Sequence, residues 1–161
     1  MSPTVEKQPV KLHIHAQRFE HGQPVDEEIQ HLKGTLYRKG EIYYLKFREQ
    51  TEDGPIDNTW KIEQDRVTVI RHGAVRMNHE YRLNSTTQGI YHTPYGALNM
   101  ETHTTAYRFQ PLGTTLPLGS GNSTNLNHRR EDRCGELHWV YHLSLDGNQV
   151  GDIRFTVTLK A

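Results

Sequence analysis

The sequence predicts an all-β protein that folds as a single up-and-down antiparallel β-barrel of about ten strands. First, apolar and polar residues alternate with a period of two in run after run, which is typical of strands with one buried face. Second, glycine-containing pairs separate the runs. Third, no convincing stretch of ten or more residues places apolar side chains at helical spacing. The chain of 161 residues is about one domain long.

The alternation is clearest in the last two runs, where Leu137, Trp139 and Tyr141 share one face and Ile153 and Phe155 begin the next. Earlier runs repeat the pattern more briefly. The expected strands, in chain order, cover residues 10–19, 28–38, 41–49, 57–64, 66–71, 74–82, 86–92, 97–109, 135–145 and 149–160.

The turns between these runs favour a meander of hairpins. Glycine accepts the positive φ that tight hairpin turns need. Such pairs occur at His21-Gly22, Lys39-Gly40, Asp53-Gly54, His72-Gly73, Tyr95-Gly96 and Asp146-Gly147. Consecutive hairpins leave little room for crossovers, and a sheet of about ten strands with one apolar face tends to curl and close. Closure also removes exposed strand edges.

Two segments fall outside this pattern. Residues 1–9, which contain Pro3 and Pro9, are expected to form a flexible N-terminal tail before the barrel domain at 10–160. Residues 111–133 are rich in Gly, Pro, Ser, Thr and Asn and predict a long mobile surface loop.

Composition excludes several classes of protein. Nineteen basic residues balance nineteen acidic ones, so the electrostatic excess expected of a nucleic-acid-binding protein is missing. No apolar run is long enough to span a membrane, and residues 1–11 lack the apolar core of a secretion signal. The single cysteine, Cys134, cannot form an intrachain disulfide and fits a reducing compartment. We therefore expect a cytoplasmic protein with no nucleic-acid or membrane partner.

Two segments carry a more specific pattern. Residues 69–81 read VIRHGAVRMNHEY, and residues 91–102 read YHTPYGALNMET. Together with the terminal hairpin at 139–160, they resemble the YwiB-like family of bacterial calycin-like, or lipocalin-like, β-barrel proteins. The resemblance implies a cytoplasmic lipocalin-like barrel whose biochemical role is unassigned, and it transfers no catalytic residue. The chain departs from the family at His79, where an aromatic or apolar residue is usual, and in a longer loop at 111–133.

No residue pattern predicts catalysis or a metal site. His13 and His15 share one strand face, but no third ligand accompanies them, and His138 and His142 are about 13 Å apart on an extended strand. Cys134 has no catalytic partner nearby in the sequence, and the chain lacks a nucleophile elbow, a phosphate loop and a dinucleotide fingerprint. We expect no enzyme activity, no catalytic residue, no metal and no cofactor.

The inward-facing polar and aromatic residues are more informative, because a small barrel either fills with side chains or leaves room for one small ligand. The alternation places Tyr81 on this face with several others. The candidate ligand-binding residues are Tyr43, Trp60, Arg71, Tyr95, Thr102, Trp139 and Tyr141. Arg71 stands out because a buried guanidinium needs an anionic partner. That partner is either an anionic ligand or a fixed carboxylate, such as Asp152 or Glu101.

Three functions follow from this reading. The first is a non-enzymatic module, monomeric or weakly dimeric, that binds a small hydrophobic or anionic ligand inside the barrel. The second is a protein-interaction or regulatory factor with a packed barrel, acting through its surface. The third, an RNA-associated factor, is disfavoured by the zero net charge. The volume of the barrel interior discriminates between the first two.

Overall fold

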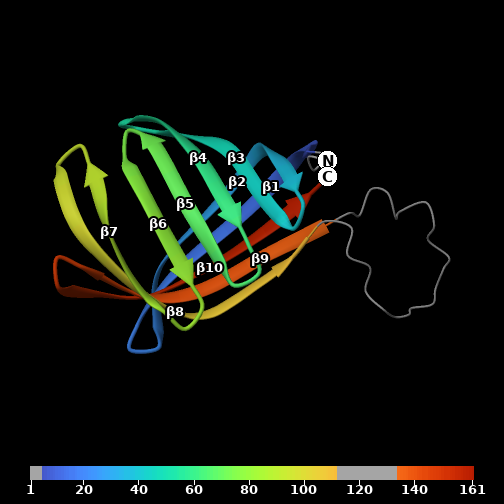
Figure 1. Ribbon diagram of the computed structural model, residues 1–161. Coiled ribbons are helices and arrows are strands. Elements are labelled where there is room, and N and C mark those ends of the chain that lie inside the picture. The colour runs from blue at the N-terminus through green and yellow to red at the C-terminus, as the bar shows by residue number, and fades with distance from the viewer. Residues whose placement is uncertain (1–4, 112–133) are drawn as a thin grey trace.

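The computed structural model describes residues 5–111 and 134–161, which form ten strands closed into one antiparallel barrel (Figure 1). Each strand pairs with its neighbours in sequence, and the first strand pairs with the last. The described residues contain no helix. The predicted fold class and strand number are therefore confirmed.

The strand bounds agree with the predicted runs to within three residues, except that β1 and β2 each begin five residues earlier than predicted. The strands are β1 (Val5–Glu20), β2 (Gln23–Lys39), β3 (Ile42–Thr51), β4 (Gly54–Ile62), β5 (Arg66–Gly73), β6 (Arg76–Arg82), β7 (Thr86–Thr93), β8 (Gly96–Gln110), β9 (Cys134–Leu145) and β10 (Asn148–Lys160).

The expected flexible tail at 1–9 is wrong for residues 5–9, which form the start of β1 and pair with the end of β2. The prediction rested partly on Pro9. This proline lies where β1 pairs with β2 alone, because the pairing with β10 begins only at Lys11. Proline is tolerated at such edge positions, since few ladder hydrogen bonds are lost there. Residues 1–4 and the predicted loop at 111–133, apart from Pro111, lie outside the described residues.

The meander gives the barrel two different ends. The turns β1–β2, β3–β4, β5–β6, β7–β8 and β9–β10 all fall at one end, which we call the hairpin end. Figure 1 shows the β7–β8 and β9–β10 hairpins projecting there. The other end holds the start of β1 and the end of β10, which lie side by side.

The packed core occupies the end opposite the hairpins. Its fully enclosed members come from strands all around the barrel, and they include Leu45, Ile62, Val67, Leu137 and Leu159. Above them lies an aromatic layer in which Trp139 stacks on Phe155 at 4.7 Å and meets Trp60 edge-on at 5.5 Å, both between ring centroids. This layer separates the packed half of the barrel from the hairpin end.

The least complete strand pairing in the described wall, which we call the β6–β7 seam, lies between β6 and β7. β6 and β7 share a single register pair, Arg76 with His92, whereas β7 pairs with β8 along its whole length. Side chains close the rest of the seam. The His79 imidazole of β6 lies 2.7 Å from Thr102 Oγ1 of β8, and Thr87 Oγ1 of β7 donates to the Glu80 carbonyl of β6.

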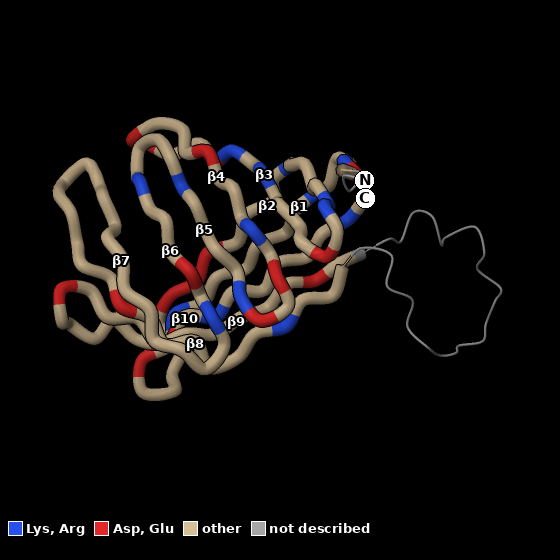
Figure 2. Tube along the Cα trace, viewed as in Figure 1, with Lys and Arg blue, Asp and Glu red and all other residues tan. Residues whose placement is uncertain are grey.

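Charged residues of both signs are spread over the strands. Figure 2 shows Lys and Arg interspersed with Asp and Glu along the chain trace. Several form cross-strand pairs on the outer surface, such as Arg48 with Asp57 at 2.8 Å and Arg108 with Glu136 at 2.7 Å. The described outer surface therefore mixes the two signs within neighbouring strands.

Candidate ligand-binding cavity

A cavity of about 380 Å³ opens near the hairpin end, above the aromatic layer. Pockets that hold small molecules in proteins are typically about 300–1,000 Å³. The lining residues are Ile14, Ala16, Glu28, Gln30, Phe47, Glu49, Asn58, Trp60, Val69, Arg71, Met77, Tyr81, Tyr91, Met100, Trp139, Tyr141, Leu143, Leu145 and Phe155. The interior is therefore packed at one end and open at the other.

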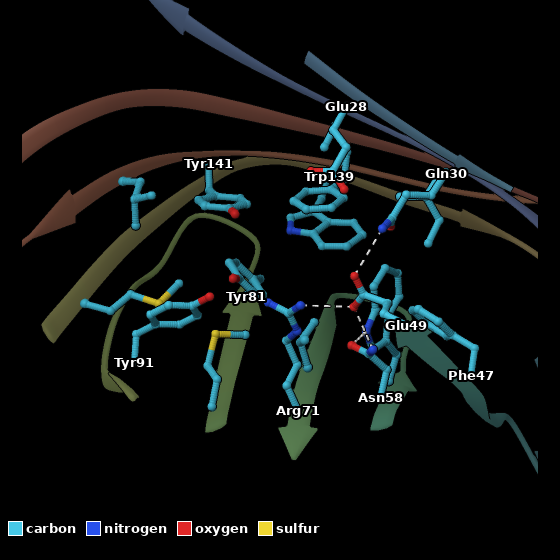
Figure 3. Close-up of a pocket in the computed structure, with 18 of the residues that line it drawn as sticks. Glu28, Gln30, Phe47, Glu49, Asn58, Arg71, Tyr81, Tyr91, Trp139 and Tyr141 are labelled. Atoms are coloured by element: carbon cyan, nitrogen blue, oxygen red, sulfur yellow. Dashed lines mark hydrogen bonds and ion pairs between the residues drawn. The ribbon is translucent and has the colours of Figure 1, made fainter. Parts of the chain in front are cut away.

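One wall of the cavity is polar and is built around the Glu49 carboxylate. Glu49 accepts hydrogen bonds from Arg71 Nη2 at 3.0 Å, from Asn58 Nδ2 at 2.8 Å and from Gln30 Nε2 at 3.2 Å. These side chains come from β2, β3, β4 and β5, which lie next to one another in the barrel. Figure 3 shows all three contacts converging on the carboxylate. Glu28, also of β2, adds a second carboxylate at the exposed margin.

Arg71 therefore has a fixed partner, but neither of the two suggested by the sequence. The ion pair is with Glu49, and the side chains of Arg71 and Glu49 are 21% and 12% exposed. Asp152 pairs instead with His142, and Glu101 accepts a hydrogen bond from Gln88. The alternatives were wrong because Asp152 and Glu101 are exposed on the outer face of the barrel, whereas Glu49 faces the cavity.

The opposite wall is aromatic and apolar. Trp139 is 1% exposed, yet its indole Nε1 has no hydrogen-bond partner. The Nε of Arg71 is likewise buried without a partner. Trp60 differs, because its Nε1 donates to Asn58 Oδ1 at 3.4 Å. Figure 3 shows Trp139 and Arg71 on opposite sides of one space. The two residues that carry these buried, unpartnered N–H donors thus line the same cavity.

Two tyrosines complete this wall. The rings of Tyr81 and Tyr141 lie 4.5 Å apart between centroids, and both residues are buried. Burial raises the pKa of Tyr81 to about 12, and it raises the pKa of Tyr141 well above its usual range. Both phenols therefore stay neutral at physiological pH and retain their hydroxyl protons.

The cavity brings together four of the seven predicted ligand-binding residues: Trp60, Arg71, Trp139 and Tyr141. The other three do not line it. Tyr43 faces inward at the far end of β3, where its ring meets Phe109 at 5.2 Å in the packed half. Thr102 is fully buried against His79. Tyr95 is 88% exposed, because it lies in the turn between β7 and β8.

Several lining residues were missed from the sequence, above all Glu49, Asn58 and Gln30. A signal for Glu49 was present. The inward positions Leu45 and Phe47 continue, two residues further, to Glu49. In the same way, Asn58 precedes the inward-facing Trp60 by two. Extending the alternation to the strand ends would have found both.

The described residues hold no group of three or more His, Cys, Asp or Glu side chains placed to bind a metal ion. His13 stacks on His31 across β1 and β2, with ring centroids 4.6 Å apart, and His15 contacts Glu27. A second concavity of about 510 Å³ lies between β7, β8 and the β9–β10 hairpin. Its lining contains no aromatic side chain, so it is the weaker candidate. No helix in the described part of the chain is long and apolar enough to cross a membrane.

Together, the closed ten-stranded wall, the packed end and the open cavity define a β-barrel with internal space for a small molecule. A model of the family described as "Domain of unknown function (DUF1934)" matches residues 12–118, more than half of the chain. The chain therefore belongs to the DUF1934 family.

Two comparisons with individual proteins agree with the predicted YwiB-like resemblance. The "Uncharacterized beta-barrel protein YwiB" of Bacillus subtilis (strain 168) is 27% identical over 101 residues, which cover 62% of this chain and 69% of that protein. The crystal structure of the ywiB protein from Bacillus subtilis superimposes with a TM-score of 0.73 at 21% identity, covering 96% of this chain and 92% of the other. The structural likeness establishes a shared barrel fold.

Proposed function

We propose that this protein is a non-enzymatic binding module that takes one small, partly apolar ligand into the hairpin end of its barrel, in the manner of a lipocalin-like protein. The observation that carries the proposal is the cavity of about 380 Å³, two of whose lining residues, Arg71 and Trp139, each carry a buried N–H donor without a partner. Buried donors without acceptors are costly, at about 1–3 kcal/mol each. A ligand that supplies acceptors removes this cost.

The open interior favours internal binding over a role carried by the outer surface alone. A packed barrel would have supported the second function, but here the packing stops at the Trp60 and Trp139 layer. The mixed surface charges in Figure 2 offer no single-sign stripe for a phosphate backbone along the strands shown. The single cysteine supports placing the module in a reducing compartment such as the cytoplasm.

The proposal is tested by titrating the protein with N-phenyl-1-naphthylamine, a neutral dye that fluoresces in apolar surroundings. We expect a saturable signal with one dye molecule per chain. Ala16→Trp should abolish the signal, because Ala16 lines the cavity and the added indole would fill it. Ala97→Trp is the matched control, since Ala97 is exposed next to the β7–β8 turn and lies outside the cavity.

The outcomes separate the two functions. Saturable binding that Ala16→Trp removes and Ala97→Trp retains supports the internal site. Absence of binding, or equal binding by both variants, contradicts it. Native mass spectrometry of freshly purified protein adds an independent readout, because a ligand acquired in the cell would appear as a defined mass increment that Ala16→Trp lacks.

A further inference from the structure

We propose that the cavity selects an uncharged, hydrogen-bond-accepting head group, such as a carbonyl on an aromatic or aliphatic body, and rejects the anionic equivalent of the same molecule. This inference rests on the proposed binding function and assigns its ligand class. It reverses the expectation that Arg71 would attract an anion.

The first reason is that the charge of Arg71 is already matched. Glu49 lies 3.0 Å from its Nη2, and this carboxylate is held in place by Asn58 and Gln30. An anion that reaches Arg71 must also approach Glu49. Repulsion between like charges is strong in such a poorly solvated place, because the local dielectric is far below that of water.

The second reason is the count of charges in the lining. Glu28 and Glu49 are carboxylates, and Arg71 is the one cationic side chain among the lining residues. Glu28 stands at the exposed margin, which an entering head group passes. The field at the mouth therefore opposes an anion before it reaches the guanidinium.

The third reason is the kind of atom left unsatisfied. Arg71 Nε and Trp139 Nε1 are both donors, and both are buried without an acceptor. A ligand ammonium supplies no acceptor and would also meet the guanidinium, so a cation leaves both donors unsatisfied. A neutral carbonyl oxygen has two lone pairs and carries no net charge. It offers an acceptor to these donors without opposing Glu49.

The test compares four probes that share one ring system: naphthalene, naphthalene-2-carboxamide, naphthalene-2-carboxylate and 2-naphthylmethylammonium. The chain has two tryptophans, and both line the cavity. Their indole N–H resonances in ¹H–¹⁵N spectra at pH 7.5 therefore report binding directly. The Trp139 resonance should shift most, since Trp60 already donates to Asn58.

We expect the carboxamide to bind at least about tenfold more tightly than the carboxylate, the ammonium or naphthalene itself, a difference of about 1.4 kcal/mol. Glu49→Gln should lower the carboxamide-to-carboxylate affinity ratio by a similar factor, because it removes the charge that repels the carboxylate. Glu136→Gln is the matched control. It makes the same change in net charge near the start of β9, beside Arg108 and outside the cavity lining. This variant should leave the affinity ratio unchanged.

Each outcome has a distinct meaning. Tighter binding of the carboxylate or the ammonium, or a ratio that Glu49→Gln does not change, overturns the head-group inference but leaves the cavity a binding site. Naphthalene binding as tightly as the carboxamide overturns the role of the two donors. If no probe shifts either indole resonance at millimolar concentration, both this inference and the proposed function are contradicted. Thermal melts of each variant show whether it remains folded.

Discussion

Among single residues, the ion pair between Arg71 and Glu49 determines which charge the polar wall of the cavity presents. Three donors hold the carboxylate, and Arg71, which is one of them, lies across the cavity from Trp139 (Figure 3). A buried ion pair is weak evidence for stability by itself, because desolvation offsets much of the attraction. Removing one partner, however, leaves the other as an uncompensated charge.

This asymmetry gives a stability prediction. Arg71→Leu should lower the free energy of unfolding by about 3 kcal/mol, the lower end of the range for breaking a buried pair, because Asn58 and Gln30 still donate to Glu49. Adding Glu49→Gln to Arg71→Leu should recover most of the loss, since the unpaired charge disappears. Urea denaturation of the wild type, the two single variants and the double variant measures the coupling. An unchanged midpoint for Arg71→Leu would show that the pair does not support the fold.

The sequence revealed which way a side chain faces, but not how deep it lies along the barrel. The period of two correctly turned Trp60, Arg71 and Trp139 inward, because the strands are regular. The same period also turned Tyr43 and Thr102 inward, yet both lie away from the cavity. Depth depends on the register of each strand against its neighbours, which alternation does not specify.

The partner of Arg71 could not be predicted for the same reason. Arg71 pairs in register with Asn58 on β4, and Glu49 on β3 is aligned with Ile56, two residues from Asn58. Both registers must be known before Glu49 and Arg71 are placed side by side. No pattern within a single strand contains that information.

At the scale of elements, the β5–β6 turn shows how close contact between strands restricts a residue. Gly73 has a φ of 142°, and a Cβ added there would lie 2.2 Å from the Pro55 carbonyl oxygen. Gly96 has a similar φ of 136°, but nothing lies within 4 Å of its Cβ position. An alanine at Gly96 would therefore meet backbone strain alone, whereas an alanine at Gly73 would meet both strain and steric overlap.

Substitution of each glycine by alanine tests this distinction. Gly96→Ala should cost about 1–3 kcal/mol from strain alone, the range for a residue held in a sparsely populated backbone region. Gly73→Ala should cost clearly more, because the methyl group also pushes β4 and β5 apart where Ile56 pairs with Gly73. Chemical denaturation of both variants compares the losses. Equal losses would mean that the backbone at Gly73 relaxes enough to remove the overlap.

The β6–β7 seam depends on one histidine in place of a hydrogen-bond ladder. His79 is 1% exposed, lies within 3.1 Å of Thr87 and 2.7 Å of Thr102, and leaves its Nδ1 unpartnered. Gly89 makes room for the ring, because a Cβ there would lie 2.9 Å from His79 Nδ1. Burial lowers the pKa of His79 to about 4, although the charge of Glu80 opposes the shift.

The free energy of unfolding should therefore fall as the pH is lowered from about 6.5 to 4. A neutral buried histidine binds fewer protons than the unfolded chain, so its contribution is complete above about pH 6.5 and is lost as the pH falls toward 4. The full loss is about 3 kcal/mol. His79→Gln keeps a polar group near Thr102 but cannot titrate, so its stability curve should be flatter between pH 6.5 and 4. Denaturation midpoints across this range measure the difference from wild type.

His142 is a control whose pKa is shifted in the opposite direction. Its hydrogen bond to Gln149 and, to a smaller extent, that to Asp152 raise the pKa of this histidine. Its contribution to the free energy of unfolding is therefore present at low pH and is lost as the pH rises. His142→Gln should therefore steepen the acid loss slightly, because it removes a group that favours the folded state in acid. Parallel curves for the wild type and His79→Gln would contradict the role assigned to His79.

At the scale of the whole molecule, closure through β1 and β10 leaves a barrel whose stability is uneven around its circumference. β1 and β10 share a continuous register from Lys11 to Phe19, and β9 is paired along both of its edges. The seam between β6 and β7 has one register pair near the hairpin end. Because local opening follows the weakest contacts, this seam should open before any other part of the described wall.

Native-state hydrogen exchange tests this expectation. Amides of β7 between Thr87 and Tyr91 that face β6 should exchange at least about tenfold faster than the central amides of β9, which corresponds to an opening free energy lower by about 1.4 kcal/mol. Lowering the pH from 7 to 5 favours protonation of His79, so the difference in opening free energy between β7 and β9 should grow. Exchange rates are first corrected for the intrinsic effect of pH. In His79→Gln this growth should disappear. If β7 and β9 are equally protected at pH 7, the hydrogen bonds of His79, Thr87 and Thr102 hold the wall as firmly as a complete ladder does.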